Sequence, residues 1–362
     1  MLNPRWGNWG GGPGSRWGGD DVDRTGSAII DFTEAAYDLE ASDEAWLPSL
    51  MERGLPVLDH GLGVAGMLYG QPPDEGPFQM LGVHVASGPE DFAERHARAL
   101  ATTPPEVLRR QVRSGGAGTA STSCWDNPQQ LAHYTSYVDY CKDLLYITAV
   151  DCKGAGVAIV APLKEVTTLT GHDEERWRML AAHVDAGHRL RQGLADKEAG
   201  EEPCTDLPHD AEAIFDAHSF RMSDAVGKAQ ERTATKKLRD AALAVDRARG
   251  KMRETDPQRA LEIWKALVRG RWSMVDWFDS DGRRFVLAIP NSPHVTDPRG
   301  LNERESQVVA YAMLGDTNKM IAYRLGLSTS RVSLLLRSAM RKLGVQTRAQ
   351  LMKKMRGFQT VQ

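Results

Sequence analysis

Cysteine is scarce in this chain of 362 residues, and long apolar runs are missing. The four cysteines (Cys124, Cys141, Cys152 and Cys204) form no C-x-x-C pair and no regular spacing, which is typical of reduced thiols in a cytoplasmic protein. No stretch of about 18 uncharged apolar residues occurs, since the nearest candidate, residues 144–163, contains Asp151 and Lys153. The N-terminus has no basic segment leading into an apolar one, so we expect no signal peptide and no membrane association.

Catalytic patterns are also missing. Residues 61–66 match G-x-G-x-x-G, but Gly70 and the Pro72-Pro73 pair follow so closely that the helix of a dinucleotide site has no room, and a glycine-rich start of a strand is the better interpretation. The histidines near the helix predicted from Asp173 do not share one face, and the Gly/Ser/Thr-rich residues 114–124 contain no P-loop lysine. We therefore predict no enzymatic activity, no catalytic residues, no metal and no cofactor, and the ligand-binding residues, if any, cannot be assigned.

Composition divides the chain into five parts. We predict a disordered Gly/Trp-rich leader, a mixed α/β domain, an acidic linker, a small α/β segment and a helical C-terminal domain. Their ranges are 1–25, 26–195, 196–212, 213–293 and 297–362.

The α/β domain of residues 26–195 alternates predicted helices and strands. Helices are expected at 29–39, 46–53 and 89–113 (broken by Pro104-Pro105) and from Asp173; strands are expected at 63–69 and 78–86, with a hairpin at 144–151 and 156–161. This order and size resemble a GAF or PAS sensory domain, although no motif is diagnostic.

In the segment of residues 213–293 we expect a helix at 223–253, a second helix starting at Asp256-Pro257, and a hairpin joining Trp272–Phe278 to 284–289. Two alternatives stay open: a second, partial PAS-like unit, or strands that complete the first sheet. Trp272 and Trp277 are expected to be core residues rather than the lining of a ligand pocket.

The C-terminal stretch from Leu301 predicts four short helices. Asn302 with Glu305 forms a capping-box pattern, Thr317 and Ser328 are candidate caps of the second and third helices, and Gly326 ends the second. Two helices joined by a short turn containing glycine are typical of a helix-turn-helix motif.

The third helix of this stretch is amphipathic in an unusual way. Val332, Leu336, Ala339 and Leu343 recur at helical spacing and predict a buried stripe. The opposite face carries Ser330, Ser333, Leu334, Arg337 and Arg341. An outward leucine can meet a thymine methyl, and an arginine has the reach for guanine or phosphate, so this face suits a DNA major groove.

Charge is distributed unevenly along the chain. From Leu301 to the end there are eleven lysines and arginines against three acids, a net charge of +8, whereas the whole chain carries −3 and the remainder therefore −11. Such asymmetry indicates a nucleic-acid-binding tail.

The tail resembles the LuxR-type (NarL/FixJ-like) DNA-binding domain over about fifty residues without a gap. The matching residues are Leu301, Arg304, Glu305, Val308, Gly315, Asn318, Lys319, Ile321, Ala322, Leu325, Ser328, Val332, Lys342, Leu343, Gly344, Val345, Arg348 and Leu351. A sigma-factor helix-turn-helix is the runner-up, but the KLGVQTRAQL ending with a fourth helix favours the LuxR type.

This resemblance, together with the outward face of the third helix, implies which residues contact DNA and which form a dimer. The expected DNA-facing residues are Thr317, Asn318, Lys319, Ser328, Ser330, Arg331, Ser333, Leu334, Arg337, Arg341 and Lys342. Dimerisation is expected through the fourth helix, with Leu351, Met352 and Met355. Residues 331–335 depart from the family's usual Thr-Val-Lys-x-His, and Met320 and Gln307 replace usual acids, so the operator preference does not carry over.

The whole sequence therefore predicts a multidomain protein: an α/β, GAF/PAS-like sensory region followed by an all-α, four-helix LuxR-type domain. The predicted function is a cytoplasmic one-component transcription regulator that binds double-stranded DNA as a homodimer, contacts RNA polymerase and responds to an unknown small-molecule or protein signal. A response regulator and an acyl-homoserine-lactone-type quorum receptor remain alternatives. A receiver needs an acidic pair after a strand, but Asp20-Asp21 follow glycine-rich residues of the leader instead.

Overall fold

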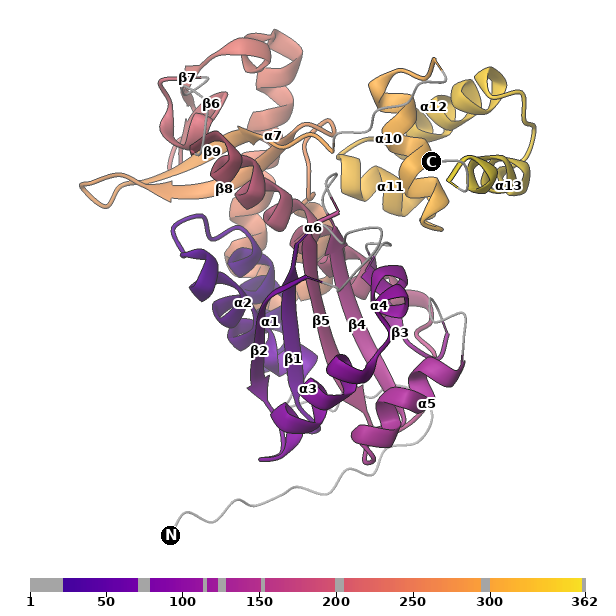
Figure 1. The fold of residues 1–362 in the computed structure, drawn as a ribbon. Helices are drawn as coiled ribbons and strands as arrows, with labels where there is room; N and C mark the ends of the chain where they lie inside the picture. The colour runs from indigo at the N-terminus through magenta and orange to yellow at the C-terminus, as the bar shows by residue number, and fades with distance from the viewer. Residues whose placement is uncertain are drawn as a thin grey trace.

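A computed structural model of the chain describes residues 22–70, 79–112, 116–122, 128–150, 154–198, 205–293 and 300–359. Cys124, Cys152, Cys204 and most of the predicted leader lie outside these residues. Figure 1 shows a unit built on a large sheet, a second and smaller sheet unit, and a helical C-terminal unit in yellow. The first helix, α1 (Val22–Ala36), begins inside the range predicted as leader.

The first sheet is antiparallel throughout and has the strand order β2-β1-β5-β4-β3. Its strands are β1 (Val64–Tyr69), β2 (Met80–Ser87), β3 (Gly116–Thr119), β4 (Asp143–Val150) and β5 (Gly156–Leu163). The predicted hairpin of residues 144–151 and 156–161 is confirmed, with Ile147 opposite Ile159. Strand β3 was predicted as loop because Gly-Ala-Gly-Thr has little strand propensity, and its pairing with β4 overrides that weakness.

Both faces of this sheet are covered. In β4, Leu145, Ile147 and Ala149 face the main core, whereas Leu144 belongs to a second cluster on the other side, as the period-two geometry of a strand requires. The main-core face is covered by α1, α2 (Asp43–Leu58) and α6 (Gly171–Glu198). The other face is covered by α3 (Phe92–Thr102), α4 (Pro105–Val112) and α5 (Pro128–Tyr137), of which α5 was not predicted.

Helix α6 is the central element of the structure. Residues 179–188 are buried without a break, so this helix is surrounded on all sides. A Cβ atom on Gly187 would lie 2.0 Å from the carbonyl oxygen of Ala36, which shows how closely α1 approaches. Because α6 contacts α1, β3, β4 and α11 (Asn318–Leu325), it connects the first sheet directly to the C-terminal domain.

The segment of residues 213–293 has its own antiparallel sheet of order β7-β6-β9-β8, so its strands do not complete the first sheet. Its strands are β6 (Ala213–Asp216), β7 (Met222–Ala225), β8 (Trp272–Phe278) and β9 (Arg284–Pro290); its helices are α7 (Arg232–Arg249), α8 (Met252–Thr255) and α9 (Pro257–Ile263), with short 3-10 turns at Pro208–Asp210 and Gly227–Gln230.

The segment forms the predicted hairpin and the predicted helix cap, but its first helix is shorter than predicted. The hairpin of β8 and β9 is confirmed, and Asp256 caps α9 by accepting from the Arg259 N–H at 3.0 Å. The helix predicted to start at residue 223 begins only at Arg232, because residues 222–225 pair with β6 instead. Trp272 is 3% exposed and is a core residue, as expected.

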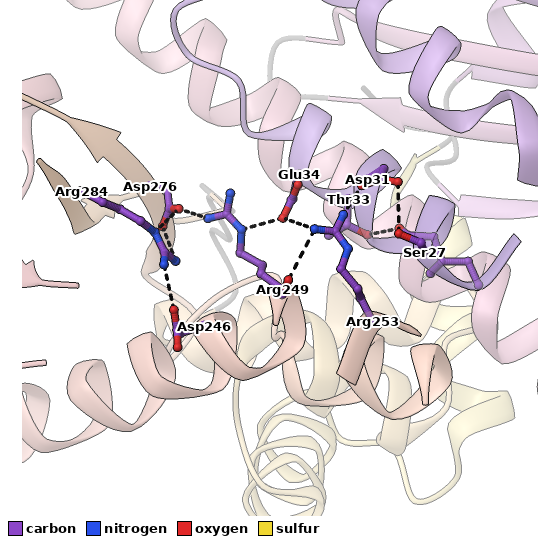
Figure 2. Close-up of polar contacts among 10 residues, drawn as sticks. Ser27, Asp31, Thr33, Glu34, Asp246, Arg249, Arg253, Asp276 and Arg284 are labelled. Atoms are coloured by element: carbon purple, nitrogen blue, oxygen red, sulfur yellow. Dashed lines mark hydrogen bonds and ion pairs between the residues drawn. The ribbon is translucent and has the colours of Figure 1, made fainter. Parts of the chain in front are cut away.

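An alternating chain of charges joins this segment to α1 (Figure 2). Arg249 donates to Glu34 at 2.6 Å and also pairs with Asp276, while Arg253 pairs with Asp31. Arg284 continues the chain, with its Nε 2.6 Å from Asp276. Because Glu34 and Asp276 each lie between two arginines and these groups are partly buried, we expect this network to hold the second unit in one position on α1.

The C-terminal unit contains α10 (Glu303–Met313), α11, α12 (Thr329–Lys342) and α13 (Arg348–Gln359), and it has a hydrophobic core of its own. In the part of the chain that the structure describes, no helix combines the length and the apolar character needed to span a bilayer.

Candidate nucleic-acid interface

The caps predicted from sequence fix the geometry of the helix-turn-helix. Asn302 accepts from the Glu305 N–H at 3.0 Å while Glu305 accepts from the Asn302 N–H at 2.9 Å, a complete capping box. Thr317 and Ser328 each accept from a backbone N–H at 3.2 Å and cap α11 and α12. Gly326 ends α11 in the left-handed conformation, at φ 60° and ψ 37°.

Glu305 also determines the position of Lys342, one of the residues expected to contact DNA. Its carboxylate receives Lys342 Nζ at 2.6 Å and the Ser338 hydroxyl at 2.7 Å. Burial by itself would raise the pKa of Glu305, but donation from Lys342, Asn302 and Ser338 outweighs it and lowers the pKa to about 2. Lys342 is therefore an internal partner of the capping box in this structure.

Helix α12 has the two faces that its sequence predicts. Val332, Leu336, Ala339 and Leu343 are buried in the core of the domain. Leu334 is 56% exposed, although leucine is usually a core residue. The side chains of Arg331, Arg337 and Arg341 are exposed beside it, and no ion pair is recorded for any of them among the described residues. The helix therefore presents an apolar and cationic surface to solvent.

Polar residues at the start of this surface are partly engaged with one another. The Asn318 side chain donates to the Ser333 hydroxyl at 3.1 Å, and Ser333 donates to the carbonyl oxygen of Thr329 at 3.0 Å. The Ser328 and Ser330 hydroxyls lie 3.1 Å apart. These contacts fix the angle between α11 and α12.

Helix α13 differs from its expected role at one position. Leu351 is 0% exposed and belongs to the core of the domain, so its side chain is not available to a second subunit. Met352 is half-buried, and Met355 packs against the same core. Arg348 also serves the domain itself, because its guanidinium donates to the carbonyl oxygens of Ala312 and Asp316.

The C-terminal domain is docked onto the rest of the chain through α11. Ile321, Ala322 and Leu325 face the core of the domain, as predicted, whereas Met320 and Tyr323 belong to the main core of the upstream units. Figure 1 shows α11 as the helix of this domain that lies toward α6. The helix is consequently buried on both sides.

A hydrogen-bonded chain at this junction connects three units of the structure. Tyr323 donates to the carbonyl oxygens of Leu261 and Trp264 at 2.6 and 2.8 Å, and its oxygen lies 2.7 Å from His183 Nε2. Nδ1 of His183 lies 2.9 Å from the Tyr37 hydroxyl. Burial lowers the pKa of His183 to about 3, which keeps the ring neutral.

Ionic contacts reinforce the docking. Arg324 is almost fully buried. Its Nε lies 2.6 Å from the Asp316 carboxylate, and its Nη1 lies 3.9 Å from the carboxylate of Asp185 on α6. Lys319, which was expected to contact DNA, instead places Nζ 2.7 Å from Glu175 of α6. Arg304 donates to the carbonyl oxygen of Gly270 at 2.8 Å.

The other face of the first sheet encloses a cavity of about 250 Å³. Met67, Tyr146 and Ala158 line it from the strands, and α3, α4 and α5 close it. His96 and Tyr134 contribute the polar pair, with Nδ1 and the hydroxyl 2.9 Å apart. No described residue of the lining is Asp, Glu, Lys or Arg, and burial lowers the pKa of His96 to about 4. The described lining therefore carries no carboxylate, ammonium or guanidinium group.

Sequence reasoning missed the docking residues and the cavity, although two signals were present. Residues 320–325, MIAYRL, are apolar around most of the helix, which is typical of a helix buried on all sides. Strands β4 and β5 carry apolar residues on both faces of the sheet, which indicates that both faces are covered. The glycine-rich stretch 61–66 leads into β1, as predicted, with Asp59 accepting from the Gly61 N–H at 2.7 Å. Among the described residues no cluster of three or more His, Cys, Asp or Glu is arranged to hold a metal ion.

Comparison with known proteins identifies one part of the chain. Residues 299–355 match the family model described as bacterial regulatory proteins, luxR family. The C-terminal unit is therefore a LuxR-family helix-turn-helix domain. The structure of SdiA in complex with octanoyl-rac-glycerol covers 93% of this chain and 94% of its own, at 10% identity and a TM-score of 0.29, which is too low to establish a shared fold. No curated protein matches the chain.

Proposed function

We propose that this protein is a cytoplasmic, one-component transcription regulator that binds double-stranded DNA through α12 and is controlled by its upstream units. The observation that carries the proposal is the exposed apolar and cationic face of α12 in a LuxR-family domain. Leu334 is 56% exposed beside arginines instead of packing in the core of the domain, and such a side chain suits contact with base edges.

The residues divide into three roles. Leu334, Arg337 and Arg341 read or hold DNA from the centre of the face, with Ser330 and Arg331 beside them. Thr317 and Ser328 orient helix N-termini, whose N–H groups suit phosphates, and Asn318 and Ser333 fix the angle between the helices. Lys342 supports the capping box. We further propose a homodimer on DNA, with Met352 and Met355 of α13 near the interface, and contact with RNA polymerase.

The first unit is proposed to be the sensor. Its antiparallel sheet, helices on both faces and internal cavity support a GAF/PAS-like sensory role. A cavity lined without carboxylate, ammonium or guanidinium groups favours a neutral, mostly apolar ligand, because burying an unpaired charge there would cost several kcal/mol. This chemistry is also compatible with a quorum receptor of the acyl-homoserine-lactone type. A response regulator is less favoured, because its acidic pair should follow a strand, whereas Asp20-Asp21 come before α1 in the sequence.

The test is DNA binding by the full chain, measured by fluorescence anisotropy on the region upstream of its own gene across a salt series. Arg337→Ala should weaken specific binding by about 1–3 kcal/mol if Arg337 reads a base, or lower the salt slope by about one if it holds a phosphate. Arg239→Ala on α7 removes an equally exposed arginine and serves as the matched control.

Leu334→Asp should abolish binding while leaving the thermal unfolding midpoint unchanged, because Leu334 is outside the core. If Arg337→Ala and Arg239→Ala bind as the parent does at every salt concentration, α12 is not the DNA-reading surface.

A further inference from the structure

Lys319 is held by an acid from outside its own domain. It is the second residue of α11, its side chain is 64% exposed, and its Nζ lies 2.7 and 2.9 Å from the two carboxylate oxygens of Glu175. Glu175 belongs to α6 and is separated from Lys319 by 144 positions in the sequence. The contact therefore exists only while the C-terminal domain is docked.

The N-terminus of α11 is where a DNA backbone is expected to pass. In a helix-turn-helix, the first helix crosses the phosphate backbone while the second lies in the major groove. A lysine in the first turn of that helix is placed to contact a phosphate, and the helix dipole favours an anion at the same end. Glu175 now supplies the anion in that position.

Neighbouring acids do not play this part. In the first turns of α6, Asp173 pairs with Arg176 at 3.5 Å and Glu174 with Arg178 at 2.8 Å, both on their own helix. Glu262 of α9 pairs with Arg259 at 2.9 Å. Donation to Glu175 is the main cause of the raised pKa of Lys319, with a smaller contribution from Glu262. Glu175 is thus the acid that holds Lys319.

We propose that Glu175 acts as a phosphate mimic, so that the docked arrangement is a state of reduced DNA affinity that releases Lys319 when α11 separates from α6. The inference rests on the proposed DNA-binding function. DNA phosphate and the Glu175 carboxylate compete for one ammonium group, and Glu175 adds a negative charge close to the path of the phosphates.

The structure also offers a route by which the sensor controls this contact. The cavity touches Leu144, Tyr146 and Thr148 of β4, while the alternate residues of the same strand pack in the core that contains α6. A ligand that shifts β4 can therefore shift α6 and with it Glu175. The effect is a change in the populations of docked and released states.

The experiment compares Glu175→Gln with Glu174→Gln in the full chain, using the DNA and salt series of the Arg337 test. Both variants remove one negative charge from adjacent positions, but only the first frees Lys319. Glu175→Gln should bind DNA roughly three- to tenfold more tightly near 0.1 M salt, with a salt slope steeper by about 0.9, as one added phosphate contact requires. Glu174→Gln should stay within about twofold of the parent, since Glu174 pairs with Arg178 and its loss leaves the contact between Glu175 and Lys319 intact.

A third variant, Glu175→Gln with Lys319→Gln, identifies the group that is released. The gain from Glu175→Gln should vanish when Lys319 is absent, because the two effects act through the same contact. Equal gains from Glu174→Gln, a gain that persists without Lys319, or no gain at all would each overturn the proposal. If Arg337→Ala still weakens binding in that case, the DNA-binding function stands and only the role of Glu175 is wrong.

Discussion

Gly326 offers a direct test of whether the C-terminal domain is docked in solution. It ends α11 at φ 60°, and a Cβ atom on it would lie 1.8 Å from the Leu267 carbonyl oxygen and 2.8 Å from the carbonyl carbon. Leu267 is 1% exposed and lies in the main core, so its backbone has little freedom to retreat. Gly315 is the matched control: its φ is 85°, but a Cβ atom there meets nothing within 4 Å.

The two alanine variants share one cost and differ in another. A non-glycine residue in the left-handed region costs about 1–2 kcal/mol, which Gly315→Ala and Gly326→Ala both incur. Gly326→Ala adds an overlap with a buried backbone, for which the typical cost is about 1–3 kcal/mol. Separation of α11 from the loop that contains Leu267 relieves this overlap with the least distortion. The additional free-energy cost of Gly326→Ala should therefore appear as undocking.

Hydrogen–deuterium exchange at the junction measures the additional free-energy cost of Gly326→Ala relative to Gly315→Ala. Amides of α11 and of residues 264–270 should exchange roughly 5- to 150-fold faster in Gly326→Ala than in Gly315→Ala, the factor that corresponds to that additional cost at about 1.4 kcal/mol per tenfold. The core of α12 should exchange at the same rate in both variants. Equal exchange at α11 in the two variants would show that the contact between Gly326 and Leu267 does not form in solution, and the docking argument would fail with it.

Two further predictions concern buried polar groups and the cavity. Because the pKa of His183 is lowered to about 3 by burial, the unfolded chain binds a proton below pH 6.5 that the folded chain does not. Its contribution to stability is therefore fully present above pH 6.5 and falls by about 1.4 kcal/mol per pH unit as the pH drops toward 3. Urea unfolding at pH 7 and pH 5 should show a smaller pH dependence in His183→Gln, and an unchanged dependence would mean that the ring is not buried neutral. Ala158→Leu places a larger side chain in the 250 Å³ cavity and should abolish the thermal stabilisation of the wild type by an uncharged apolar ligand; stabilisation that survives would locate the ligand elsewhere.

Several of the cations in the tail are paired within the structure. The tail carries a net charge of +8, which indicated DNA binding. Arg324 and Arg348, however, bond within the domain or its junction, and Lys319 and Lys342 are paired with acids. The cationic surface available on α12 therefore comes mainly from Arg331, Arg337 and Arg341. Net charge therefore points to the helix-turn-helix domain but not to the cations of that domain that stay exposed.

The sequence by itself determined the features that depend on neighbours a few positions away. The capping box of Asn302 and Glu305, the caps at Thr317 and Ser328 and the buried stripe of α12 all arise from residues three or four apart, where spacing fixes direction. The hairpins of β4 with β5 and β8 with β9 were predicted for the same reason, since short connections leave little choice of partner. These local rules sufficed to predict which side of α12 is exposed.

Tertiary structure alone decided which of those local surfaces stay free. Tyr323 bonds to His183 across 140 positions and to Leu261 across 62, and no pattern within α11 specifies those partners. The same holds for Lys319, which has the chemistry of a phosphate contact but meets Glu175, and for Leu351, whose apolar side chain enters the core of its own domain. A side chain's chemistry follows from its identity, whereas its partner depends on how distant segments pack, because the free energy of burial rewards any complementary surface that the fold brings into contact.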